Sequence, residues 1–170
     1  MSPNSSVLSV NNVRIHYSID AGVVKAVEDV SFTLNKGERL ALVGESGSGK
    51  STLAMSMMGL TPPPGKIVSG KILYNGVDLL DLSYEDMRNY RGNDIAMIFQ
   101  EPMTSLNPVM RIGKQMNEVL IKHKDLSIEE ATEKSIEMLD AVGIPNPKDR
   151  MNEYPHQFSG GMRQRVMIAM

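Results

Sequence analysis

Residues 44–51 read Gly44-Glu45-Ser46-Gly47-Ser48-Gly49-Lys50-Ser51, which matches the pattern G-x-x-x-x-G-K-[ST]. In this pattern the glycines let backbone N–H groups curl around phosphate oxygens, the lysine reaches the terminal phosphates and the hydroxyl binds Mg²⁺. Residues 39–43 form a short apolar run that predicts a buried strand, and residues 51–58 predict a helix whose N-terminus faces the anion. The alternative is a glycine-rich turn with an incidental lysine, which would not need the hydroxyl residues that follow it.

The individual residues of this loop have expected contacts to a nucleotide. Lys50 would neutralise charge on the β- and γ-phosphates and is the first catalytic candidate, while Ser51 is the expected Mg²⁺ ligand. Glu45 lies in the loop, but its side chain is expected to point away from the phosphates, so we assign it no catalysis. The predicted cofactor-binding residues of the loop are Gly44, Glu45, Ser46, Gly47, Ser48, Gly49, Lys50 and Ser51.

A second glycine motif, Phe158-Ser159-Gly160-Gly161-Met162, stands near the far end of the chain. A serine at a helix N-terminus beside two glycines offers a hydroxyl, free amides and the positive end of the helix dipole. These groups are suited to a phosphate. The alternative is an ordinary Ser-Gly-Gly helix cap.

These motifs and three longer stretches resemble the ATP-binding subunits of ABC transporters, most closely the di- and oligopeptide import ATPases. Residues 26–32 resemble the strand that precedes the phosphate loop in that family, residues 97–108 resemble its Q-loop, and residues 154–165 resemble its signature region. The resemblance runs from about Leu8 onward. Phe158 and Met162 depart mildly from the leucine and glutamine that the family usually has there.

The resemblance implies an α/β fold. We expect a P-loop NTPase core of the ABC ATPase type, with an N-terminal antiparallel β subdomain and an α-helical subdomain, incomplete at the C-terminus. Residues 1–109 would form the β subdomain and the P-loop core, and residues 110–170 the helical subdomain with the signature motif.

The resemblance also implies roles for residues outside the loop. Gln100 would sense Mg²⁺ and the terminal phosphate, which makes it a catalytic and metal candidate, although it could be a strand-end glutamine facing water. Thr52 would donate to the α-phosphate, or is simply a helix residue. Ser159, Gly160 and Gly161 would bind the ATP that is held by the loop of a second subunit.

An aromatic ring ahead of the phosphate loop can stack on adenine. The family's aromatic lies at the end of the first strand, so Tyr17 is the implied base platform. His16 and Val23 are weaker alternatives, and Tyr17 could instead be a packing residue.

The chain ends at Met170, a few residues into the helix that the signature motif opens. In the family the Walker B aspartate, the glutamate that polarises the attacking water and the switch histidine come later, so none is assigned here. Phosphoryl transfer depends on positioning and on charge stabilisation by Mg²⁺ and its ligands. These residues taken literally are therefore expected to bind nucleotide without turnover, whereas the complete form would hydrolyse ATP.

Composition places the chain among ordinary soluble globular proteins. It has 170 residues, of which 41% are hydrophobic and 22% charged, and the net charge of −2 gives no reason to expect a nucleic-acid partner. Without cysteine, these residues contain no disulfide framework. Residues 1–6 lack the pattern of a signal peptide, and no apolar run approaches a membrane span, so we expect a cytoplasmic protein that reaches the membrane through a partner.

The implied function is ATP-driven uptake of di- or oligopeptides by a subunit that lies peripherally on the cytoplasmic side of the cell membrane. The implied partners are integral membrane permease subunits, a second ABC ATPase subunit and, indirectly, an extracytoplasmic solute-binding protein. Residues 101–108 contain two prolines and Leu106, which is expected to be exposed, and would dock the coupling helix of the permease. Uptake of nickel or another small solute is an alternative, and so is an ABC ATPase of translation or repair, against which the Q-loop segment argues.

Apolar periodicity predicts the remaining elements. Strands are expected at residues 8–17, 71–74 and 95–99, the second followed by an Asn75-Gly76 turn. Capping boxes at Ser83 and Ser127 each open a helix, and a further helix is expected at residues 110–124.

Overall fold

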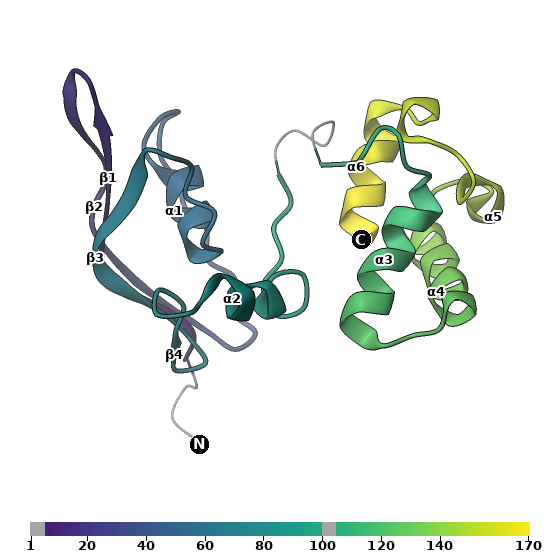
Figure 1. Cartoon of the computed structure of the whole chain (residues 1–170), viewed down its shortest axis with the longest axis horizontal. Coiled ribbons are helices and arrows are strands. Elements are labelled where there is room, and N and C mark those ends of the chain that lie inside the picture. The colour runs from purple at the N-terminus through teal and green to yellow at the C-terminus, as the bar shows by residue number, and fades with distance from the viewer. Residues whose placement is uncertain (1–5, 100–104) are drawn as a thin grey trace. The chain divides into compact units, whose positions relative to one another are not determined.

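The computed structural model describes residues 6–99 and 105–170 (Figure 1). The chain forms two compact units, Met1–Arg91 and Gly92–Met170. The sequence instead predicts a subdomain boundary between residues 109 and 110. That boundary stays a prediction.

The first unit is built on a four-stranded antiparallel sheet in the order β2-β1-β3-β4. Its strands are β1 (Ser6–Ile19), β2 (Gly22–Asn35), β3 (Gly65–Tyr74) and β4 (Val77–Asp78). The predicted alternation of β1 is confirmed, because Val13 and Ile15 are fully buried while Arg14 between them is exposed. Val10 is also fully buried although it lies three residues before Val13, because the register of β1 shifts between them.

Two helices complete the first unit. Helix α1 (Lys50–Met57) lies against the sheet and buries Leu53 (Figure 1). Helix α2 (Tyr84–Tyr90) begins as predicted, because the backbone N–H of Asp86 donates to Oγ of Ser83 at 3.1 Å. Arg91 follows this helix, and its Nε donates to the carbonyl of Met58 at 2.7 Å, which satisfies an acceptor at the end of α1.

Two strands predicted from apolar runs are absent from the described residues. Residues 39–43 and 95–99 contain no strand, and the exposed fractions are 45% for Leu40 and 91% for Val43. A strand exists only through hydrogen bonds to a neighbouring strand. Neither segment finds such a neighbour within residues 6–99 and 105–170, so the prediction of buried strands was wrong for this chain.

The second unit is helical. It contains α3 (Ile112–Lys124), α4 (Ile128–Ala141), α5 (Pro147–Arg150), the 3₁₀ turn η2 (Pro155–Gln157) and α6 (Gly160–Ala169). The capping box at Ser127 is confirmed, with the side chain of Glu130 bonded back to the N-cap. The core of this unit consists of Leu106, Ile112, Met116, Leu139, Ile144, Met151, Phe158 and Val166.

Leu106 corrects an expectation. Its sequence context predicts a side chain exposed in a docking loop, but Leu106 is only 3% exposed and belongs to the helical core. The polar and proline residues around it turn outward instead, because Asn107 and Pro108 are exposed. Among the described residues, no helix is both long enough and apolar enough to cross a membrane.

Candidate functional site

The loop of residues 44–49 depends on two glycines in left-handed backbone conformations. Gly47 has φ +81° and Gly49 has φ +89°, a region that residues with a side chain rarely adopt. At Gly49 a Cβ atom would also stand 2.2 Å from the carbonyl oxygen of Ala26 in β2. The strand thus forms the support on which the loop turns into α1, and only glycine fits between them.

Lys50 is folded back over this loop. Its Nζ donates to the carbonyls of Gly44 at 2.7 Å and Glu45 at 2.6 Å, and to Oγ of Ser48 at 3.1 Å. All three acceptors are neutral, and no salt bridge among the described residues involves Lys50. Within residues 6–99 and 105–170 no carboxylate therefore neutralises the ammonium charge, so an anion at the loop would be attracted to it.

The start of α1 adds further positive potential. No side chain caps its first turn within the described part of the chain, and the first turn contains no acidic residue. The first N–H groups of a helix have no partner inside the helix and carry the positive end of its dipole. Ser51 is exposed and Thr52 is half-buried in this turn. Loop, lysine and helix start together form a place suited to phosphate oxygens.

Tyr17 lies in β1, and its ring packs against the neighbouring strand β3. It pairs with Val24 of β2 and Gly65 of β3, and a Cβ atom at Gly65 would stand 2.6 Å from Cζ of the tyrosine. The ring therefore covers the backbone of Gly65, as the packing alternative requires. Val24 lies two residues before Ala26, so the strand that supports the phosphate loop also pairs with Tyr17.

The alternatives to Tyr17 are engaged differently. Nε2 of His16 contacts the carboxylate of Glu28, and the hydrogen bond from His16 lowers the pKa of that carboxyl, with Lys25 adding to the effect. Val23 is 60% exposed in β2. Neither residue offers a free aromatic ring to a base.

The second glycine motif begins α6. Ser159 is the N-cap, and its Oγ accepts from the backbone N–H of Met162 at 3.3 Å. Gly160 and Gly161 are exposed, with open space where their side chains would be. The arrangement is a helix cap, and it also presents the glycine amides to solvent. Phe158 fills the core at 3% exposure, which gives its departure from the family's leucine a packing role.

The predicted site residues fall into both compact units. Tyr17 and residues 44–52 belong to the first unit, and residues 159–161 belong to the second. Gln100 lies outside the described residues. Within residues 6–99 and 105–170 there is no cluster of three or more His, Cys, Asp or Glu that could hold a metal ion.

Ala26 is a contributor to the loop that sequence reasoning missed. Its backbone carbonyl lies close to Gly49, a contact that no side-chain pattern reveals. The glycine pattern predicts that another group of the protein or a ligand approaches the loop closely, but it does not identify that group.

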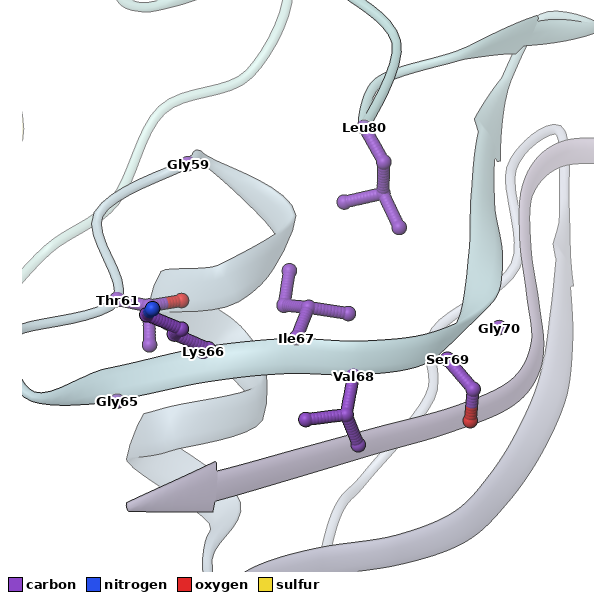
Figure 2. A pocket seen from close by; sticks show the side chains of 9 residues that line it. All are labelled: Gly59, Thr61, Gly65, Lys66, Ile67, Val68, Ser69, Gly70 and Leu80. Atoms are coloured by element: carbon purple, nitrogen blue, oxygen red, sulfur yellow. The ribbon is translucent and has the colours of Figure 1, made fainter. Parts of the chain in front are cut away.

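A cavity of about 600 Å³ lies beside β3 (Figure 2). Ile67 and Leu80 point toward each other in it, whereas Val68 points to the other side of the strand (Figure 2). Its lining residues are Gly59, Thr61, Gly65, Lys66, Ile67, Val68, Ser69, Gly70 and Leu80. None of these is a predicted site residue. A second, mostly apolar cavity of about 500 Å³ lies in the helical unit between α3 and the start of α4.

Comparison with known proteins identifies the relatives of this chain. The sequence profile of the family described as ABC transporter matches residues 27–170. The oligopeptide transport ATP-binding protein OppD of Bacillus subtilis (strain 168) is 53% identical over 96% of this chain and 46% of the relative. The dipeptide transport ATP-binding protein DppD of the same organism is 52% identical over 96% of this chain and 49% of the relative. The oligopeptide transport ATP-binding protein OppD of Salmonella typhimurium is 52% identical over 99% of this chain and 50% of the relative.

The comparison with solved structures points to the same family as these relatives. The ATP-binding cassette MJ0796, in a dimeric post-hydrolysis state bound to ADP and Pi, superposes with a TM-score of 0.83 at 27% identity, covering 95% of this chain and 67% of that chain. The expected α/β fold of an ABC ATPase cassette is thereby confirmed. The chain spans about half the length of the curated relatives it matches.

Proposed function

Because this chain belongs to the ABC transporter family, we propose that it is the ATP-binding part of an importer for di- or oligopeptides. The observation that carries the proposal is the loop of residues 44–50. There Lys50 bonds to neutral acceptors, and the start of α1 has no side-chain cap from the part of the chain that the structure describes. The named activities of the relatives, oligopeptide and dipeptide transport, support the choice of solute.

Each residue of the loop has a proposed task in holding ATP. The backbone amides from Gly47 to Ser51 bind the phosphate oxygens, and Thr52 donates to the α-phosphate. Lys50 exchanges its bonds to the carbonyls of Gly44 and Glu45 for bonds to the β- and γ-phosphates. This exchange replaces neutral acceptors by anionic ones, which attract the ammonium charge more strongly.

Mg²⁺ is proposed as the metal that accompanies ATP. The hydroxyl of Ser51 fits this hard cation, which prefers oxygen ligands and usually also binds the phosphates of the nucleotide. Gln100 is proposed as a second contact to Mg²⁺ and the terminal phosphate. The metal would neutralise charge on the transferred phosphoryl group during hydrolysis.

A second ATPase subunit is proposed to complete the site. Ser159, Gly160 and Gly161 would bind the γ-phosphate of ATP held by the loop of the opposite subunit, and Tyr17 would stack on the adenine of its own ATP. The dimeric state of the cassette MJ0796 supports such pairing. Exposure of the two glycines leaves their amides accessible to a partner.

The proposed location is the cytoplasmic side of the cell membrane, where permease subunits hold the protein and a solute-binding protein delivers the peptide from outside. The docking surface is proposed in residues 101–108. Asn107 and Pro108 are exposed there, next to Val109 at 79% exposure, so an apolar side chain is available to a permease helix. The net charge of −2 gives no support to a nucleic-acid partner.

The test is binding and hydrolysis of ATP by the full chain, with Lys50→Ala as the matched variant. Binding that is lost in Lys50→Ala supports the nucleotide site, and turnover above that of the variant supports an active ATPase. Binding without turnover would favour the alternative of a nucleotide-binding module. Equal binding by both proteins would contradict the proposed site.

A further inference from the structure

Gln115 of α3 is a buried polar residue whose side chain binds the backbone of the loop that precedes this helix. It is 7% exposed, and its Oε1 accepts from the backbone N–H of Asn107 at 2.8 Å. Its Nε2 donates to the carbonyl of Asn107 at 3.0 Å and to the carbonyl of Met110 at 2.9 Å. A buried glutamine is uncommon, and here its oxygen and both its donor hydrogens are used on the backbone.

The loop that Gln115 holds combines a buried anchor with an exposed tip. Leu106 is inserted into the helical core, whereas Val109 is 79% exposed. Asn107 lies between them, and its side-chain Oδ1 accepts a hydrogen bond from the backbone N–H of Val109 at 3.1 Å. The three bonds from Gln115 therefore fix the base of the exposed tip to α3.

The start of the same helix also holds a second segment. The backbone N–H of Ile112 donates to the carbonyl of Glu153 at 2.9 Å, and that of Gly113 donates to the carbonyl of Met151 at 2.9 Å. No side chain of Arg111 caps the helix, so these remote carbonyls satisfy its first amides. At Gly113 a Cβ atom would stand 2.8 Å from the carbonyl oxygen of Met151, so glycine permits this close approach.

The second segment, residues 151–153, is followed along the chain by hydrogen-bonded residues up to Ser159. The backbone N–H of Tyr154 donates to Oε1 of Gln157 at 2.8 Å, and Nη1 of Arg163 in α6 donates to the carbonyl of Pro155 at 3.3 Å. Ser159 follows as the N-cap of α6. A continuous series of hydrogen bonds and short chain segments thus joins the exposed loop to the second glycine motif through the first turn of α3.

We propose that Gln115 is a positioning residue that couples the loop of residues 105–110 to the signature motif of residues 159–161. A partner helix that presses on the exposed tip displaces α3 because the bonds of Gln115, together with buried Leu106, make tip and helix one rigid piece. The turn of residues 151–153 then moves with α3, and Ser159 with it. This inference rests on the proposed function for its partner and its nucleotide. The hydrogen bonds of Gln115 and of the first turn of α3 do not depend on that function.

The first test is made without nucleotide or partner. Amide hydrogen exchange of the full chain should show Asn107 protected, and Gln115→Met, which keeps length and apolar volume but removes the bonds, should speed its exchange by about tenfold or more. Gln164→Met, the same change at an exposed position of α6, should leave Asn107 unchanged. Exchange of Asn107 at the rate of an unprotected peptide in the unaltered chain would overturn the inference, whether or not any variant folds.

The second test measures whether loop and signature segment move together. The chain has no cysteine, so spin labels can be placed at Val109→Cys and His156→Cys, with Glu118→Cys and Glu133→Cys on α3 and α4 as the control pair. Gln115→Met should broaden the distance distribution of the first pair and leave that of the control pair unchanged. An unchanged first pair would overturn the inference, and so would equal broadening of both pairs, because that indicates a general loss of packing.

The functional arm separates this inference from the proposed function. In membranes that contain the assembled transporter, Gln115→Met should lower the stimulation of ATP turnover by a transported peptide about fivefold, with KM for ATP within about twofold. An equal loss of basal and stimulated turnover would overturn the coupling role. Failure of the full chain to bind ATP would instead contradict the proposed function and leave the exchange and spin-label results standing.

Discussion

Replacing Gly49 by alanine should destabilise the chain much more than the same change at Gly47. Both glycines have a left-handed backbone, with φ +89° and +81°, and this conformation costs a residue with a Cβ atom about 1–2 kcal/mol. At Gly47 nothing lies within 4 Å of the added carbon, so this strain is the whole effect. At Gly49 the carbon would stand 2.2 Å from the carbonyl oxygen of Ala26 and 3.2 Å from Cγ2 of Val27.

The contact at Gly49 cannot be relieved by a side chain alone. The carbonyl belongs to the backbone of β2, so either the strand or the phosphate loop must move, and overpacking of this kind costs about 1–3 kcal/mol. The expected loss in the free energy of unfolding is therefore about 2–5 kcal/mol for Gly49→Ala against about 1–2 kcal/mol for Gly47→Ala.

Urea unfolding of the two variants and the unaltered chain measures this difference, provided that the free energy of unfolding falls with urea concentration at the same slope in all three. Nucleotide affinity provides a second measurement, because movement of the loop displaces its amides. Equal losses of stability in the two variants would refute the reasoning, since they would mean that β2 does not support the loop at Ala26.

Three further predictions concern stability. Leu106→Ala should lower the free energy of unfolding by about 2–5 kcal/mol because the side chain is buried in the helical core, whereas Val109→Ala at the exposed tip should have little effect in the same denaturation experiment. Arg91→Lys keeps the charge but loses the two bonds to the carbonyls of Met58 and Gly59, so thermal unfolding should report a loss of about 1 kcal/mol, with Arg88→Lys at an exposed position of α2 as control. The backbone hydrogen bond from Ser127 lowers the pKa of Glu130 below its ordinary 4.5, so this carboxylate stabilises the fold above pH 4.5 and its contribution disappears as the pH falls through the lowered value. Glu130→Gln should therefore destabilise at pH 7 and progressively less in acid, and a cost independent of pH would contradict this.

The parts of the fold that the sequence predicts correctly are those whose causes are local. The helices that begin at Ser83 and Ser127 depend on a side chain that caps an amide three residues later, and both caps are present. The alternation of Val13 and Ile15 in β1 is likewise visible within a few residues.

The errors concern features that depend on distant residues. Residues 39–43 are apolar enough for a buried strand, but pairing requires a neighbour that the run itself cannot specify. Leu106 sits among polar residues and prolines, which is typical of a surface loop, and only the packing of the helical unit places it in the core. Local pattern and tertiary contact disagree at both places, and the tertiary contact decides.

The same distinction applies within the candidate site. The glycines and lysine of residues 44–50 follow a pattern that phosphate chemistry limits residue by residue, so the sequence alone predicts them as a phosphate site. The carbonyl of Ala26 lies against Gly49, and the side-chain amide of Gln115 bonds to backbone groups of Asn107 and Met110. Contacts with backbone groups leave no side-chain pattern, so many sequences are compatible with either contact. Residues with a proposed ligand contact are therefore easier to predict from sequence than residues that contact the backbone of a loop, and in this chain the second group is where the structure adds most.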